Sequence, residues 1–247
     1  MATRDEADAD VTRSPHDVAM TRRVIKYLQV PRTERDDAWR ERFYRAIPTA
    51  ALVVGSPQLL TGPDGFEYVV LRTPKPPQRF APRTLAQISI ECTSRGRGAV
   101  LDPEPGSAAW VFRYGDLWSL RAHGGFVGDG VEPLEAQVIP SGRRRLQRET
   151  EFLVGAPSAH LFPSWARRVV GSYLRSHMGV RDPRVALVMD FAMRPTRSLA
   201  FNVYRDDQED AAAFDLAMQR LASWYLPPGL GILSLGRDSD GSLQTKL

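Results

Sequence analysis

The order of apolar segments between residues 150 and 236 constrains the fold more than any other feature of this 247-residue sequence. Runs of β-branched and aromatic residues typical of strands alternate there with segments whose apolar residues recur at helical spacing. In chain order the predicted elements are strand 151–155, helix 164–177, strand 184–191, strand 198–204, helix 209–225 and strand 231–235. This β-α-β-β-α-β order predicts a ferredoxin-like domain, in which two helices cover one face of a four-stranded antiparallel sheet.

Each of these two helices carries large apolar side chains along a single stripe. They are Trp165, Val169, Tyr173 and Leu174 on the first helix and Phe214, Met218, Leu221 and Tyr225 on the second, with Trp224 beside that stripe. Such spacing buries one face of a helix and leaves the opposite face in water. We therefore expect both helices to pack against the sheet.

The N-terminal half also mixes helices and strands. Asp17 is an N-cap candidate for a helix that stops before Pro31, and Thr33 opens a second helix that ends at Pro48. The other expected elements are paired strands at 51–55 and 66–73, a loop at 74–82, a helix with Leu85, Ile88 and Cys92 on one face, and strands at 98–102 and 109–114. The predicted fold class is therefore α+β in both halves.

The domain organisation follows from these elements and from shifts in composition between them. We predict, in chain order, a disordered acidic arm at 1–16, an α+β domain with a helical N-terminal extension at 17–141, a basic linker at 142–149, the ferredoxin-like domain at 150–236 and a flexible tail at 237–247. Two small domains also suit a chain that exceeds the commonest domain size.

Composition predicts a globular protein of the cytoplasm. Apolar residues make up 43% of the chain and charged residues 25%, which is typical of soluble domains. No uncharged apolar run approaches the ~18 residues that cross a bilayer, and the first ten residues lack the features of a secretory signal. The single cysteine, Cys92, excludes an internal disulfide and any site built from several cysteines.

Common cofactor motifs are missing from the sequence. It has no H-E-x-x-H pattern, no cysteine pair and no G-K-[ST] phosphate loop. The glycines at 96–98 and 229–231 lack the third glycine and the following helix of a dinucleotide fingerprint. We therefore predict neither a metal nor a cofactor.

Residues 110–126 gather aromatic and polar side chains, and the simpler interpretation is structural. Trp110, Phe112 and Tyr114 alternate as on a strand with one aromatic face. Asp116 precedes a short helical pattern, so its carboxylate is placed to accept backbone N–H groups at a helix start. On this interpretation the segment is an apolar wall.

The competing interpretation makes the same segment an active site. Asp116, Ser119 and His123 would line a cleft, Arg121 would hold a small anionic substrate, and the histidine would move a proton. The serine lies in LWSLR rather than on the sharp G-x-S-x-G turn that usually presents a nucleophile. The sequence therefore favours the wall.

Interaction residues are expected in the basic linker and on the aromatic segment. They are Arg143, Arg144, Arg145, Arg148 and Trp118. Adjacent guanidinium groups gain affinity for nucleic acid by releasing counterions, yet a solvated linker explains the same run more simply. The sequence therefore disfavours nucleic acid as the partner and favours another protein.

Several stretches carry a family resemblance. They are FLVGAPSAHLFPSWARRVVGSYLRSHMGVRDPRVALVMD and SLAFNVYRDD in the C-terminal half, and FYRAIPTAALVVG, DGFEYVVLRTP, FAPRTLAQISI and GAVLDP in the N-terminal half. With them, most of residues 40–236 resembles the two domains of the SseB-like, or "enhanced serine sensitivity", family. The resemblance implies a pair of small α+β domains in a bacterial cytoplasmic protein, with no established reaction.

We therefore expect a non-enzymatic protein that binds another protein as an adaptor or regulatory partner. The first alternative is an enzyme with its site around Asp116, Ser119, Arg121 and His123. The second alternative is nucleic-acid binding through the arginine linker. The sequence leaves the partner's identity and the oligomeric state open.

Overall fold

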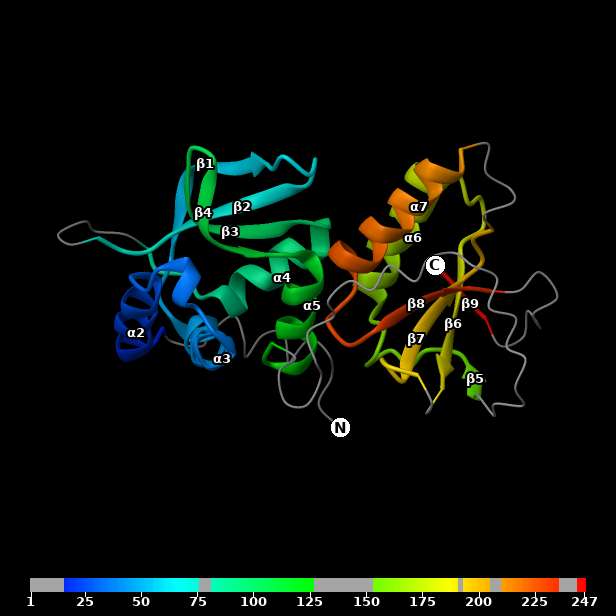
Figure 1. Cartoon of the computed structure of the whole chain (residues 1–247), viewed down its shortest axis with the longest axis horizontal. Helices are drawn as coiled ribbons and strands as arrows, with labels where there is room; N and C mark the ends of the chain where they lie inside the picture. Colours follow the sequence, from blue (N-terminus) through cyan, green and yellow to red (C-terminus); the bar gives the residue numbers. More distant parts are fainter. Residues whose placement is uncertain (1–15, 76–80, 127–152, 191–192, 205–209, 236–243) are drawn as a thin grey trace. The chain divides into compact units, whose positions relative to one another are not determined.

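The computed structural model describes residues 16–75, 81–126, 153–190, 193–204, 210–235 and 244–247 (Figure 1). The chain divides into two compact units, unit 1 (residues 1–128) and unit 2 (residues 129–247), and each is described by itself. The predicted linker lies outside the described residues, as does nearly all of the predicted arm. Both units combine helices with a mixed sheet, which confirms the α+β class. Within the described ranges, no helix has the length and apolar character needed to cross a membrane.

Unit 1 follows the predicted order of helices and strands. Its elements are α2 (Val18–Leu28), the 3₁₀ turn Arg32–Glu34, α3 (Asp37–Ala46), the 3₁₀ turn Ile47–Thr49, β1 (Val53–Thr61), β2 (Glu67–Arg72), α4 (Leu85–Arg95), β3 (Gly98–Glu104), β4 (Ser107–Phe112) and α5 (Tyr114–His123). The carboxylate of Asp17 caps α2, as predicted. Helix α3 starts four residues after Thr33, because Asp36 supplies its N-cap by accepting the Trp39 N–H at 2.6 Å.

The sheet of unit 1 has the strand order β1-β2-β3-β4 in the part of the chain that is described. The predicted hairpin of β1 and β2 is confirmed, and β3 and β4 form a second antiparallel pair. Strands β2 and β3 run parallel because α4 lies between them in the chain and returns it to the same end of the sheet. Helix α4 starts at a capping box in which Thr84 and Gln87 satisfy each other's backbone N–H groups.

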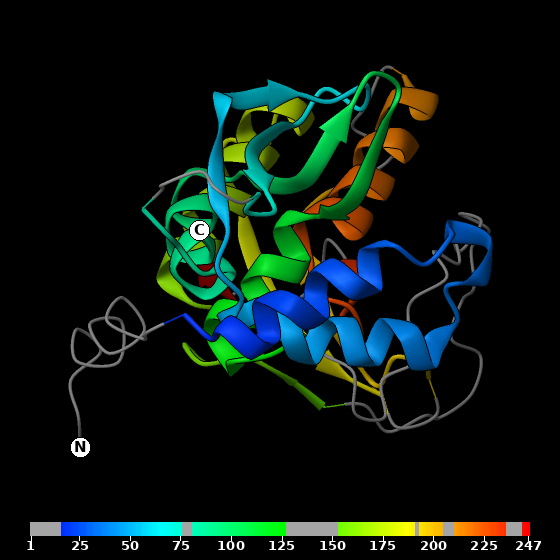
Figure 2. The same ribbon diagram turned by 90° about the vertical axis from the view of Figure 1, so that its left-hand side faces the viewer.

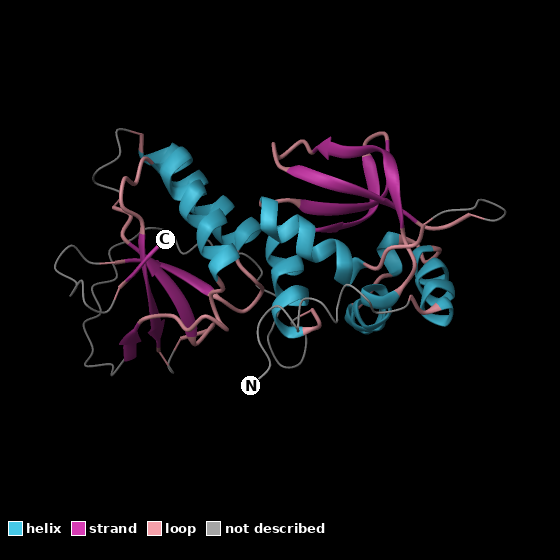
Figure 3. Cartoon of the chain, turned by 180° about the vertical axis from the view of Figure 1, so that it is seen from behind, coloured by secondary structure: helices cyan, strands magenta, loops and turns pink. Residues whose placement is uncertain are grey.

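The core of unit 1 lies between this sheet and the helices on one side of it (Figures 1 and 3). Phe43 of α3 has no exposed surface, and its ring centroid is 5.0 Å from that of Trp39 and 5.2 Å from that of Trp110. Phe112 stacks on Phe43 at 6.2 Å and on Phe126 at 5.6 Å. The predicted apolar wall is therefore part of this core.

Unit 2 contains the predicted order of elements and one more strand. Its elements are β5 (Leu153–Gly155), α6 (Ser164–Met178), β6 (Arg184–Met189), β7 (Arg197–Phe201), α7 (Ala211–Arg220) with a π-helical continuation at Leu221–Tyr225, β8 (Gly231–Ser234) and β9 (Thr245–Lys246). Helices α6 and α7 lie together on one face of the sheet (Figures 1 and 3). The Tyr173 hydroxyl of α6 donates to the carbonyl of Ala217 on α7 at 2.9 Å, which ties the two helices together.

One detail of the predicted unit 2 needs correction, and one further strand joins its sheet. The sheet is mixed rather than antiparallel, because β7 and β8 are parallel, and its order β5-β6-β7-β8 does not confirm the ferredoxin-like arrangement. Strand β9, within the predicted tail at 237–247, pairs with Arg184 and Val185 of β6. Among the described residues, β5 pairs with β6 only at 187–189, and β9 pairs with the same strand at 184–185.

Candidate functional site

Asp116 holds the start of α5 rather than standing in an open cleft. The residue is 5% exposed, and its Oδ2 accepts the backbone N–H of Arg113 at 2.9 Å. The Arg113 guanidinium lies 3.4 Å from the same oxygen. The predicted capping role is therefore observed, although the helix begins two residues earlier than Asp116.

The other polar residues of the alternative active site also contact the surrounding backbone. The Ser119 hydroxyl donates to the carbonyl of Gly125 at 3.1 Å, just beyond the end of α5. Arg121 Nη1 donates to the Ile90 carbonyl at 3.3 Å and to two hydroxyls near the end of α4. His123 lies exposed in the last turn of α5. These bonds fix the end of α5 and its contact with α4, and they give Ser119 and Arg121 structural roles.

The predicted interaction residues differ in how far the structure describes them. Trp118 has no exposed surface, and its ring lies edge-on to Tyr114 at 6.3 Å, so its indole is not presented to solvent. The four arginines at 143–148 lie outside the described residues. Within the described ranges, no group of three His, Cys, Asp or Glu side chains is placed to hold a metal ion.

We expect Cys92 to react with a chromogenic disulfide reagent only after unfolding. The thiol is buried on α4, and desolvation, reinforced by the charge of Glu91, raises its pKa to about 12. Little of the buried thiol is then ionised at pH 8, and the thiolate is the reactive form. The measurement is the labelling rate at pH 8 with and without guanidinium chloride. Native labelling at the rate of a free thiol would contradict this assignment.

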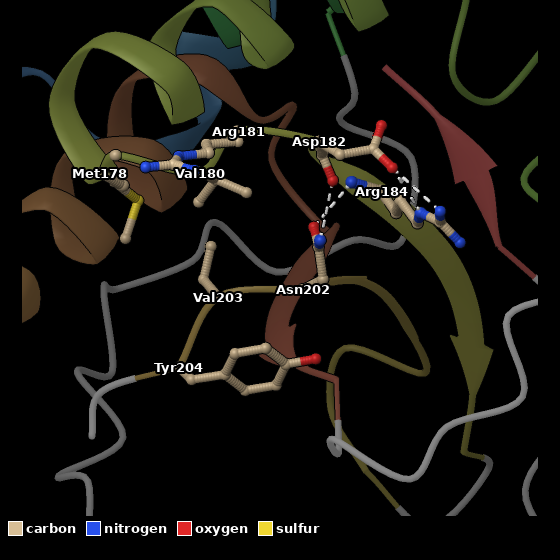
Figure 4. A pocket seen from close by; sticks show the side chains of 9 residues that line it. Met178, Val180, Arg181, Asp182, Arg184, Asn202, Val203 and Tyr204 are labelled. Atoms are coloured by element: carbon tan, nitrogen blue, oxygen red, sulfur yellow. Dashed lines mark hydrogen bonds and ion pairs between the residues drawn. The ribbon is translucent and has the colours of Figure 1, made fainter. Parts of the chain in front are cut away.

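The described part of unit 2 has a shallow polar hollow beside the end of α6 (Figure 4). Gly179, with φ of 66°, ends the helix in the left-handed region and turns the chain toward β6. The hollow has a volume of about 460 Å³ and is lined by residues 178–182, Arg184 and residues 202–204.

A network of polar contacts occupies one side of the hollow. Asn202 Oδ1 accepts the Arg184 N–H at 2.7 Å, and Asn202 Nδ2 donates to the Asp182 carbonyl at 2.9 Å. The Asp182 carboxylate accepts from the Arg184 guanidinium at 2.9 Å and lies 3.8 Å from Lys246 Nζ. Arg181 is exposed and extends away from this network in Figure 4. The hollow could hold a small anionic group beside Arg181, but it presents no acid–base pair aimed at a common point.

We expect the pKa of Asp182 to lie below its ordinary value of 3.8. The hydrogen bonds from Arg184 are the main cause, and the positive charges of Lys246 and Arg175 add to it. Because the folded pKa is depressed, the stability that Asp182 contributes is present above the unfolded pKa and is lost as the pH falls through the folded pKa. Carbon-detected NMR titration of the Asp182 carboxyl measures this. Arg184→Gln should raise the midpoint, and an unchanged midpoint would refute the assignment.

A second candidate surface is the outer edge of β1 in unit 1. Strand β1 lies at the end of the strand order, so among the described residues only β2 pairs with it at Leu59–Thr61. Leu59 and Leu60 are 38% and 42% exposed, and consecutive residues on a strand point to opposite faces. Both faces of this strand end are therefore apolar and accessible. The sequence analysis missed it because the predicted strand ends at residue 55, whereas β1 continues to Thr61.

Comparisons of this chain with protein-family models, with curated proteins and with solved structures give no match.

Proposed function

We propose that the chain is a non-enzymatic binding protein that takes an extended segment of another protein along the outer edge of β1. We also propose that the chain is a member of the SseB-like family. The observation that carries it is the uncharged, partly apolar stretch of edge strand at residues 58–61. Native edges are usually blunted by charge, proline or a bulge, so an edge stretch that lacks charge is suited to pairing with another chain.

Hydrogen-bond alternation places the free backbone groups of this edge. The N–H of Gly62 donates to the carbonyl of Phe66 at 2.8 Å, so that pair is hydrogen-bonded across the hairpin. In an antiparallel pair, bonded and non-bonded positions alternate. Leu60 opposite Tyr68 is then bonded to β2, whereas the N–H and C=O of Leu59 and Thr61 point away from β2. A partner strand would meet these groups.

The same strand limits what can bind. The register shifts between Val54 and Leu59, and Pro57 has no N–H to offer. The part of the edge that can pair with another strand is therefore short. This favours binding of a short extended segment over continuous pairing between copies of this chain. Leu59 and Leu60 would add apolar contact on the two faces of that segment.

The two alternatives from the sequence receive less support from the contacts. Asp116 and Ser119 both have backbone partners, as expected of residues that hold a helix in place. The hollow in unit 2 offers a guanidinium, but its carboxylate, Asp182, is already paired with Arg184 and lies near Lys246. Strand addition uses the backbone groups and exposed leucines of β1 directly.

Peptide display gives the test of the proposed function. Short peptides selected on the wild-type chain would be titrated by calorimetry against Leu59→Lys, Leu60→Lys and Thr61→Pro. Thr61→Pro removes one outward N–H while leaving the bonds to β2 intact. Each change should weaken binding by about tenfold or more, since each removes about 1.4 kcal/mol or more of apolar contact or hydrogen bonding.

Two control variants match these changes. Leu216→Lys alters an exposed leucine on α7, which is 49% exposed, and Thr61→Ala keeps the N–H that Thr61→Pro removes. Both controls should bind as the wild type does. If the selected peptides bind the β1 variants as well as the wild type, or lose affinity equally for Leu216→Lys, the proposal fails.

A further inference from the structure

Helix α2 has an exposed face that is strongly basic. Residues 18–32 contain Arg22, Arg23, Lys26 and Arg32 and no acidic residue. The apolar side of the helix, including Val24, is buried in the core of unit 1, so the basic residues face solvent.

Three of these cations form one continuous surface, the α2 basic face (Arg22, Arg23 and Lys26). Arg22 and Lys26 are four residues apart, so they are neighbours on one stripe, and Arg23 lies beside them. All three are exposed, and no carboxylate within the described residues forms an ion pair with them. Arg32 shares its short turn with Glu34 and is therefore left out of this face.

The neighbouring helix α3 provides a contrast within the same unit. The two helices lie side by side (Figure 2, blue), and Trp39 Nε1 donates to the Tyr27 carbonyl at 3.0 Å. On α3, however, Arg40 lies 3.1 Å from Asp37, and Arg45 pairs with Glu41. The basic residues of α3 are largely neutralised by their own helix, whereas those of α2 repel one another with no local compensation.

We infer that the α2 basic face binds the phosphate backbone of a nucleic-acid duplex without reading its sequence. A duplex carries regularly spaced negative charge, and each phosphate that an arginine or lysine neutralises releases condensed counterions. Two of the three residues are arginines, whose planar fork matches phosphate oxygens. A membrane surface is disfavoured because the apolar side of α2 is buried and cannot enter lipid.

This surface shares no residue with the β1 edge or with the arginines at 143–148, so each can be altered alone. Fluorescence anisotropy of a labelled 20-base-pair duplex of arbitrary sequence, titrated with the full chain between 20 and 200 mM salt, gives the slope of log affinity against log salt. The triple variant Arg22→Gln, Arg23→Gln, Lys26→Gln should reduce the magnitude of that slope by about 2.7, from about 0.9 for each of three phosphate contacts. Because the linker arginines are the same in the wild type and in this variant, their contribution to the slope cancels in the difference between the two proteins.

The matched control is the triple variant Arg40→Gln, Arg42→Gln, Arg45→Gln on α3, which makes the same change in net charge. It should leave the slope within about one phosphate contact of the wild type. Circular dichroism confirms that both variants keep their helices. An equal fall in slope for both variants would show a response to overall charge and would overturn the inference.

Two further outcomes also contradict it. If only the variant with Arg143, Arg144, Arg145 and Arg148 replaced by glutamine loses slope, the linker is the binding surface. If poly-glutamate, added at the same concentration of negative charge as the duplex, displaces the duplex from the α2 basic face, the partner is an acidic protein segment and not a nucleic acid.

Discussion

Phe43→Ala should lower the free energy of unfolding by about 3–5 kcal/mol. The ring has no exposed surface and contacts Trp39, Trp110 and Phe112. Removing it takes away apolar burial and leaves a cavity among aromatic rings that are themselves fixed by α3 and β4. Such rings cannot collapse into the space without breaking the pairing of β4 with β3.

Urea unfolding followed by circular dichroism measures this loss. The control is Leu216→Ala, which truncates a side chain that is 49% exposed and should change stability by no more than about 0.5 kcal/mol. A loss below about 1 kcal/mol for Phe43→Ala would mean that the aromatic cluster does not form the core of unit 1.

Arg35→Ala should destabilise the chain by about 2–3 kcal/mol, since hydrogen bonding by a charged group contributes about 1.5–3 kcal/mol net to stability. Its guanidinium donates to the carbonyls of Val30 at 3.0 Å, Ala109 at 2.9 Å and Leu28 at 3.1 Å. It also lies 4.7 Å from the centroid of the Trp39 ring. One side chain thus joins the loop after α2 to strand β4.

Partial desolvation, with a smaller contribution from Arg32, lowers the pKa of Arg35, yet an arginine stays charged at neutral pH. The same urea experiment tests the prediction with two controls. Arg35→Lys keeps the charge but lacks the planar fork, so it should lose most of the same stability. Arg42→Ala removes an exposed arginine and should cost about 0.5 kcal/mol or less. Full rescue by lysine would show that charge, and not the three directed bonds, holds the loop.

Local signals in the sequence predict most elements because they act over a few residues. Asp17 marks the start of α2 through a side-chain cap, and the stripe of large apolar residues on α6 places Tyr173 and Leu174 in the core. The predicted stripe includes Val169, but the residue that is fully buried is its neighbour Val170. Neighbouring positions on a helix differ by 100°, so packing decides such boundaries.

Strand order could not be predicted in the same way. Periodicity identifies β7 and β8 as strands, but their parallel pairing depends on where α7 returns the chain. Strand β9 has only two residues, Thr245 and Lys246, and becomes a strand because the edge of β6 beyond β5 is open. Its stability comes from long-range pairing, which no local pattern encodes.

Candidate sites were predicted even less completely. The helix-start role of Asp116 follows from its residue type and position, so the sequence predicts it. Two sites depend instead on how far an element continues beyond the residues that pack in the hydrophobic core. They are the exposed edge at Leu59 and Leu60 and the hollow beside Gly179. Alternation and stripe patterns do not specify that distance.

Residue-resolved amide hydrogen exchange on β1, with and without a selected peptide, tests strand addition most directly. Strand addition predicts that the amides of Leu59 and Thr61 become protected on binding, while the amide of Leu60, already bonded to β2, changes little. Protection confined to other residues, or equal protection of all three amides, would contradict it.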